Sequence, residues 1–122
     1  MSLKPSTILV VDDEPTLCRV ISRILNRIGF EIVEAPNGND GINKLNDTIK
    51  GAIIDLGLPD IPGTEVMMAL RAQRPDLPIL LTSGSDFRKM NISEDAQTLC
   101  LHKPFMPSEL REKVTKLFGD AS

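Results

Sequence analysis

Short apolar runs alternate with longer segments of helical period along the whole chain. The first run, residues 7–11, is rich in β-branched residues and uninterrupted, which is typical of a strand buried on both faces of a parallel sheet. Apolar residues then recur at helical spacing over residues 17–28, after Pro15 and before Gly29, and this predicts an amphipathic helix. The alternation of strands and helices predicts an α/β domain built around a parallel sheet.

The remaining elements follow the same alternation. Strands are predicted at residues 31–34, 51–56, 78–82 and 98–102. Helices are predicted after the turn at Asn37, after the loop 57–63, and from about Pro107, the last burying Leu110, Val114, Leu117 and Phe118. Residues 85–97 are polar and poorly periodic, so a short or irregular helix is expected there. The predicted domain covers residues 7–119, with a leader or disordered segment at 1–6 and a tail at 120–122.

Polar side chains stand where the predicted strands end. These residues are Asp12 and Asp13, Asp55, Thr82 and Ser83, and Lys103. In an open parallel sheet the carboxyl ends of the strands form the edge at which ligands bind. An acidic pair alone is most often a solvated turn or a helix cap. Asp55 is different because it closes an apolar run, where a carboxylate without a cation or hydrogen bonds would be costly.

Clustered carboxylates predict a site for magnesium, or for manganese, because hard oxygen ligands suit these ions. Asp13 and Asp55 are the expected direct ligands, Asp12 is expected to act through water, and the backbone carbonyl of Gly57 is the third protein ligand.

A carboxylate can also attack phosphorus when the charge on the phosphoryl oxygens is neutralised. Lys103 and the hydroxyl of Thr82 could serve this purpose at Asp55. Strand alternation lets only one of Thr82 and Ser83 face the site, and Thr82 is favoured.

Composition narrows the class of protein. The 122 residues, 41% hydrophobic, suffice for one domain, and the net charge of -3 argues against a nucleic-acid surface. Arg19, Arg23 and Arg27 form a basic stripe, either a solvated helix face or, less expected, a rim for an acidic partner.

Cysteine and histidine content narrows it further. Cys18 and Cys100 lie far apart, which suggests neither a disulfide framework nor a zinc site. No segment resembles a signal peptide or a membrane span, so a cytoplasmic location without membrane contact is expected. His102 is the only histidine, so a conventional Ser/His or Cys/His catalytic pair is not expected.

Four motifs resemble the response-regulator receiver family of two-component systems in order and spacing. They are ILVVDDEP at residues 8–15, DLGLP at 55–59 with Gly63, LTSG at 81–84, and KPF at 103–105. The resemblance covers about residues 7–118. It implies a flavodoxin-like, doubly wound sheet of five parallel strands in the order 2-1-3-4-5, with helices on both faces.

The resemblance also implies roles for single residues. Asp55 corresponds to the phosphoacceptor, Asp12 and Asp13 to the acidic pair at the metal, Thr82 to the switch hydroxyl, and Lys103 to the lysine that pairs with the phosphoryl group. The implied donor is a phosphohistidine on a sensor histidine kinase or a histidine phosphotransfer domain. The expected function is that of a signalling domain in a phosphorelay, rather than that of an enzyme.

The chain departs from the family pattern in three places. Cys100 stands where the family usually has Tyr or Phe, and it is interpreted as a small core residue rather than as a redox-active one. Gly57 and Gly84 stand two residues after Asp55 and Thr82, at positions that in this family influence the lifetime of the phosphoryl group. The irregular segment 85–97 and the LLTSG run resemble receivers attached to hybrid sensor kinases, so the chain is compatible with a fragment of a larger regulator or kinase.

The residues disfavour three rival functions. An aspartyl phosphatase is disfavoured because Gly57 stands where such hydrolases place a second acid. A flavodoxin-like module for a nucleotide or flavin is disfavoured because the loop after the first strand is acidic rather than Gly-rich. A degenerate receiver that serves only as a docking surface is disfavoured because all the expected site residues are present.

Overall fold

The computed structural model describes residues 6–121, and these form one five-stranded parallel sheet in the order β2-β1-β3-β4-β5. The strands are β1 (Thr7–Val11), β2 (Glu31–Ala35), β3 (Ile49–Asp55), β4 (Ile79–Ser83) and β5 (Thr98–His102). The strand order and the flavodoxin-like winding predicted from the sequence are confirmed. The strand order reverses beside β1, so the carboxyl ends of β1 and β3 border the crevice where such sheets bind ligands.

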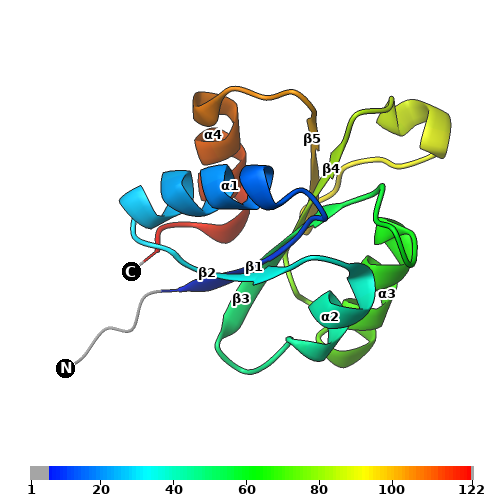
Figure 1. Ribbon diagram of the computed structural model, residues 1–122, viewed down its shortest axis with the longest axis horizontal. Coiled ribbons are helices and arrows are strands. Elements are labelled where there is room, and N and C mark those ends of the chain that lie inside the picture. The colour runs from blue at the N-terminus through cyan, green and yellow to red at the C-terminus, as the bar shows by residue number, and fades with distance from the viewer. Residues whose placement is uncertain (1–5, 122) are drawn as a thin grey trace.

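Helices cover both faces of the sheet (Figure 1). They are α1 (Pro15–Arg27), α2 (Gly38–Asn43), α3 (Gly63–Gln73) and α4 (Pro107–Phe118). One apolar cluster joins α1 and α4 to the sheet through Ile8, Val10, Ile53 and Leu80. The other joins α2 and α3 to the opposite face through residues that include Leu9, Val11, Ile54 and Leu81. Because β1, β3 and β4 are buried on both faces, their sequences are continuous apolar runs rather than alternating ones.

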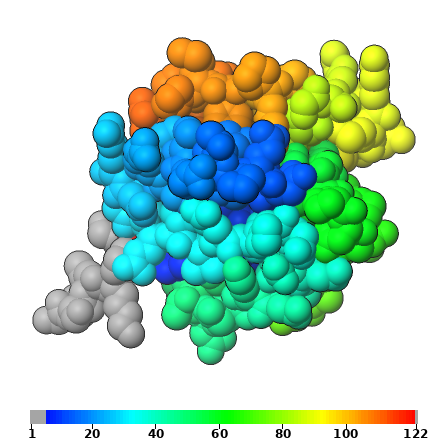
Figure 2. Space-filling view, viewed as in Figure 1, coloured from blue at the N-terminus to red at the C-terminus, as the bar shows by residue number. Residues whose placement is uncertain are grey.

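The connection between β4 and β5 contains no α-helix. It holds one short 3-10 helix, η1 (Phe87–Met90), which ends at Asn91 in the left-handed conformation with φ 56°. Phe87 and Ile92 are half-buried and, like Cys100, pack against the apolar cluster on the α2/α3 side of the sheet. In the space-filling view this yellow segment projects from one corner of the molecule (Figure 2). The expected short, irregular helix therefore agrees with the structure.

The structure corrects the sequence-based picture in two places. Val20 and Ile28 fit the apolar period of α1, yet they are 41% and 36% exposed, because no neighbouring element covers them. Ala121 falls in the predicted tail, but it is buried and its carbonyl accepts a hydrogen bond from the Ser6 amide at 3.0 Å. Packing therefore extends beyond residue 119, while the rest of the predicted leader, residues 1–5, lies outside the described residues. Among these described residues no helix is long and apolar enough to cross a membrane.

Gly63 should be intolerant of any side chain because of its close contact with the end of β3. A Cβ atom there would meet the backbone carbonyl oxygen of Asp55 and approach the Cα of Leu56 to 2.7 Å. Gly63→Ala should therefore lower the free energy of unfolding by about 1–3 kcal/mol, measured by urea denaturation. At Gly84 a Cβ would have no atom within 4 Å. Gly84→Ala is the matched control and should change stability by at most about 1 kcal/mol, in the favourable direction. Equal losses in both variants would contradict this picture.

Candidate functional site

Strand alternation brings four polar side chains to the same side of the sheet. Val10, Ile53, Leu80 and Leu101 all lie in the cluster beneath α1 and α4. Two residues further along each chain segment stand Asp12, Asp55, Thr82 and Lys103, so by the period of two they share that side. Asp55 is also the direct register partner of Thr82 on β4. The carboxyl ends of four segments therefore build one site.

Ser83 belongs to the other side of the sheet. It follows Thr82, so alternation directs it away from Asp55, and its hydroxyl accepts a hydrogen bond from the Ser85 amide at 2.9 Å. Thr82 itself is 1% exposed. Of the two hydroxyl residues, Thr82 is thus the one that shares the face of Asp55.

Three carboxylates lie close together at this edge. One oxygen from each of Asp12, Asp13 and Asp55 falls within 4.8 Å of the others. Asp12 and Asp55 are buried, whereas Asp13 is exposed. Carboxylates packed this closely repel one another unless a cation lies between them, and an all-oxygen set of this kind suits Mg²⁺. The chemistry of the donor set therefore fits a divalent cation.

Lys103 supplies the positive charge of the cluster. Its Nζ lies 3.0 Å from Asp12 Oδ2 and 3.3 Å from Asp55 Oδ1. The lysine side chain is only 16% exposed, which makes its ion pairs stronger than those on an open surface. Lys103 directly follows β5, and its backbone amide donates a 2.8 Å hydrogen bond to the Ser83 carbonyl.

The surroundings of Asp55 and Lys103 shift the pKa of each group for different reasons. Burial raises the pKa of Asp55, and Asp12 adds to the rise, while the charge of Lys103 opposes it. Burial alone would lower the pKa of Lys103, but its hydrogen bond to Asp12 and the charges of Asp12 and Asp55 raise it above its ordinary value. Lys103 therefore stays charged at neutral pH, whereas the surroundings of Asp55 only partly compensate the charge of its ionised form.

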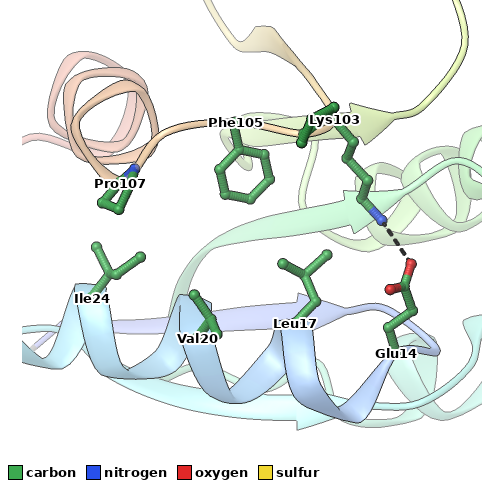
Figure 3. A pocket seen from close by; sticks show the side chains of 8 residues that line it. Glu14, Leu17, Val20, Ile24, Lys103, Phe105 and Pro107 are labelled. Carbon is green, nitrogen blue, oxygen red and sulfur yellow. Dashed lines mark ion pairs between the residues drawn. The ribbon is translucent and has the colours of Figure 1, made fainter.

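Glu14 is a site residue that the sequence analysis did not single out. Its amide donates to Asp12 Oδ1 at 2.9 Å, so both oxygens of Asp12 are engaged, one by this amide and one by Lys103. The Glu14 carboxylate lies 3.7 Å from Lys103 Nζ and is 64% exposed. The sequence does show a third acid directly after Asp12 and Asp13, but spacing alone does not tell in which direction its side chain points, which is toward Lys103 (Figure 3).

Asp60 is a second residue that sequence reasoning missed. Its two carboxylate oxygens accept the amides of Gly38 and Asn39, each at 2.8 Å, and these hydrogen bonds lower its pKa. They tie the loop between β3 and α3 to the start of α2. No local signal predicts this contact, because the partners are more than twenty residues apart in the sequence.

The two glycines of the site leave space beside the carboxylate. Gly57 lies next to Asp55, and a Cβ added to it would come to 3.9 Å from Asp55 Oδ2. Gly84 is also exposed and has open space where a side chain would be. The site is thus less shielded at these two positions than a chain with larger residues would leave it.

Cys100 and His102 belong to β5 itself, before Lys103, and lie outside the acidic cluster. Cys100 is half-buried, and burial with the nearby Glu94 charge raises the pKa of its thiol to about 11. A neutral thiol at physiological pH acts as a small apolar side chain, which agrees with the interpretation of Cys100 as a small core residue. Its amide donates to Glu94 Oε2 at 2.9 Å. His102 is exposed at the end of the strand.

A flavodoxin-like sheet with an acidic cluster and a lysine at its carboxyl edge defines a CheY-like class of α/β domain. Comparison with known proteins specifies the family: residues 8–115 match the model of the response regulator receiver domain. The chain belongs to this family, and it is a receiver domain of the kind found in two-component response regulators, for which phosphoacceptor function is standard.

Individual relatives support this assignment. The chain is 31% identical to a chemotaxis protein CheY homolog of Campylobacter jejuni, over 94% of each protein. It is 30% identical to the transcriptional regulatory protein CpxR homolog of Haemophilus influenzae, over 89% of this chain and 48% of that protein. Among solved structures it resembles the response regulator TrrA of Thermotoga maritima, determined in complex with Mg(2+)-BeF, with a TM-score of 0.80 and 34% identity over 92% of this chain and 98% of that one.

Removing the charge of Asp55 should stabilise the fold in buffer without divalent cations. The carboxylate is largely buried and close to Asp12, so its ionised form is disfavoured in the folded state. Asp55→Asn should therefore raise the melting temperature by a few degrees at pH 7. Asp47→Asn, at an exposed position, should leave it within error. The sign follows from linkage: an acid whose pKa is raised on folding destabilises the protein above that pKa. A lower melting temperature for Asp55→Asn would contradict this account.

Proposed function

We propose that Asp55 is the phosphoacceptor of this domain, and that it receives a phosphoryl group from a phosphohistidine with the help of Mg²⁺ or Mn²⁺. The observation that carries the proposal is the arrangement around Asp55: a lysine ammonium at 3.3 Å and two further carboxylates within 4.8 Å. This is a nucleophile beside a positive charge, next to a set of ligands for a hard cation.

The chemistry of transfer would proceed from the chain's own groups. An oxygen of Asp55 attacks phosphorus, the new O–P bond forms, and the P–N bond breaks with its electron pair returning to the imidazole nitrogen of the donor. The ammonium of Lys103 is close enough to Asp55 to pair with a phosphoryl oxygen there. The hydroxyl of Thr82, on the same face, would donate a hydrogen bond to another phosphoryl oxygen. Because Thr82 belongs to β4, this hydrogen bond would couple phosphorylation to the position of that strand.

The proposed ligands of the cation are Asp13 and Asp55, with Asp12 acting through water and the backbone carbonyl of Gly57 as a further ligand. The clustering of the three carboxylates supports the first three, and the position of Gly57 beside Asp55 is compatible with the fourth. When bound, such an ion supplies positive charge toward the phosphoryl oxygens.

The proposed output of the switch is a change along β4 and the segment that follows it. Ser83 binds the Ser85 amide, and this is where the connection carrying η1 begins. A movement of Thr82 would therefore reach Phe87, Ile92 and Cys100, which all pack against the apolar cluster on the α2/α3 side of the sheet. With Cys100 in place of an aromatic residue, the change would be one of packing around Cys100 rather than the rotation of an aromatic ring at that position.

We assign the domain a single transfer of the phosphoryl group to Asp55, rather than turnover as a phosphatase. Gly57 provides no second acid beside Asp55, and the lone histidine, His102, stands exposed at the end of β5. The proposed partners are a sensor histidine kinase or a histidine phosphotransfer domain, and the proposed location is the cytoplasm.

Intact mass after incubation with acetyl phosphate tests the proposal. One added phosphoryl group is expected for the wild type with Mg²⁺, none without Mg²⁺, and none for Asp55→Asn. Beryllofluoride binding, followed by NMR, excludes hydrolysis that is too fast to observe. No addition and no beryllofluoride binding would overturn the assignment of Asp55.

Magnesium should stabilise the wild type through the acidic cluster. A cation bound only by the folded state adds about 1.4 kcal/mol at ten times its dissociation constant. The melting temperature of the wild type should therefore rise with Mg²⁺ concentration, whereas that of Asp13→Asn should rise much less. Asp47→Asn, remote from the cluster, should behave like the wild type. Equal shifts in all three proteins would place the cation elsewhere.

The open space beside Asp55 should set the lifetime of the phosphoryl group. Gly57→Met would place a side chain over Asp55 Oδ2, exclude water, and slow the loss of the phosphoryl group several-fold. The decay of the phosphorylated mass after removal of the donor measures this. Ala72→Met, at an exposed position of α3, is the control. An unchanged decay in Gly57→Met would refute the hypothesis that the glycine keeps the site open.

A further inference from the structure

The loop that joins β3 to α3 is closed at its base. The Leu56 amide donates to the Thr82 carbonyl at 2.9 Å, and the Gly63 amide donates to the Leu56 carbonyl at 3.2 Å. Gly63 also lies close against the backbone of Asp55 and Leu56. Both ends of the loop therefore meet at the carboxyl end of β3, and residues 57–62 extend from that point.

The outer part of this loop is tied to α2 through Asp60. Its carboxylate oxygens accept the amides of Gly38 and Asn39, each at 2.8 Å. Within residues 6–121, no other hydrogen bond joins residues 57–62 to a segment outside β3 and α3. The polar attachment of the outer loop therefore depends on one side chain.

The start of α2 is a fixed point for this attachment. The helices α2 and α3 lie side by side on one face of the sheet (Figure 1). A Cβ atom on Gly38 would come to 2.5 Å from a side-chain carbon of Ile61. One on Gly41 would come to 2.7 Å from the side chain of Val11 in β1. The backbone of α2 thus lies directly against the loop and against the sheet, an approach that glycine permits.

Gly57 connects this loop to the acidic cluster. The hydrogen bond from its amide to the Asp55 carboxylate opposes the rise in the pKa of Asp55. Its carbonyl is the proposed backbone ligand of the cation and stands three residues before Asp60 in the loop. Mg²⁺ requires nearly octahedral geometry with oxygen ligands at about 2.1 Å, and a backbone carbonyl has no rotamers with which to adjust. The alignment of this carbonyl therefore depends on how firmly the loop is held.

We propose that Asp60 is a positioning residue for the cation site. By tying residues 57–62 to α2 it holds the Gly57 carbonyl at the acidic cluster, so it raises the affinity for Mg²⁺ without contacting the ion. The inference rests on the proposed function, because it takes Gly57 as a ligand, and it adds a residue outside the carboxylate cluster. Since coupling between two sites is reciprocal, cation binding also strengthens the hydrogen bonds at the start of α2. A carboxylate that only capped α2 would stabilise the helix and leave the affinity for Mg²⁺ unchanged.

The magnesium affinity of two Asp60 variants tests this role. The chain has no Trp or Tyr, so binding is followed by amide chemical shifts in NMR spectra. Asp60→Ala should weaken Mg²⁺ binding about tenfold, the lower end of the effect expected when a partner that orients a metal ligand is lost. Asp60→Asn keeps one acceptor oxygen, so its affinity should lie between those of the alanine variant and the wild type.

Asn37→Ala is the matched control. The Asn37 side chain caps the same helix by accepting the Asp40 amide at 2.8 Å, and its removal leaves both hydrogen bonds of Asp60 in place. This variant should have a lower melting temperature than the wild type but the same affinity for Mg²⁺. The comparison separates the stability of α2 from the attachment of the loop.

Amide hydrogen exchange measures the same coupling from the side of α2. The amides of Gly38 and Asn39 should exchange about tenfold more slowly in wild type saturated with Mg²⁺ than without it, because reciprocity requires the same factor. No such slowing is expected in Asp60→Ala, which lacks the acceptor, or in Asp13→Asn, which lacks a proposed ligand of the ion.

Each alternative outcome overturns a distinct statement. Wild-type affinity in Asp60→Ala, or in Asp60→Asn where the alanine variant does not fold, would overturn the proposal. An equal loss in Asn37→Ala would assign the effect to α2 itself, and equal losses in the two Asp60 variants would assign it to the charge of the carboxylate. Either result would overturn the role of the two hydrogen bonds. Failure of the wild type to bind Mg²⁺ would instead reject the cation site of the proposed function, on which the inference depends.

Discussion

Lys103 and the buried carboxylates of Asp12 and Asp55 constrain each other, and the rest of the edge is arranged around them. Two carboxylates of low exposure repel each other at this separation, and a positive charge beside both of them offsets that repulsion. Lys103 provides that charge at 3.0 and 3.3 Å. The burial that weakens solvation of the lysine also strengthens its attraction to the two acids. The cluster is therefore compatible with a stable fold, and its three carboxylates outnumber the one ammonium group, which favours the binding of a cation.

The parallel sheet explains why such a cluster can exist at all. Asp12, Asp55 and Thr82 stand at the ends of β1, β3 and β4, which are buried almost throughout, so the core holds these strand ends rigidly. Alternation then fixes the direction of the last side chain without any further specification. A polar group that would be destabilising within the sheet becomes accessible at its edge, and neighbouring strands bring several such groups within reach of one another. The site is therefore a consequence of the fold's register rather than of a special loop.

The strand ends and the strand order could be predicted from the sequence because they depend on local period and on short apolar runs. The choice of Thr82 over Ser83 followed from alternation alone, and the structure puts Thr82 on the face of Asp55. The exposure of Val20 could not be predicted, since helical spacing identifies a face but not whether another element covers it. The contacts of Asp60 and Ala121 were missed for a related reason: they join segments far apart in the chain, where pattern carries no information. The roles of Asp12, Asp13 and Gly57 toward a cation remain predictions.

The central claim is that the phosphoryl group is carried by Asp55, and locating it chemically tests this most directly. Borohydride reduces an aspartyl phosphate to homoserine, so treatment of the acetyl-phosphate-labelled protein, followed by proteolysis and peptide mass spectrometry, identifies the modified residue. The account predicts homoserine at position 55 and nowhere else. Homoserine at position 12 or 13, or a borohydride-resistant phosphoryl group on Ser83 or His102, would contradict it.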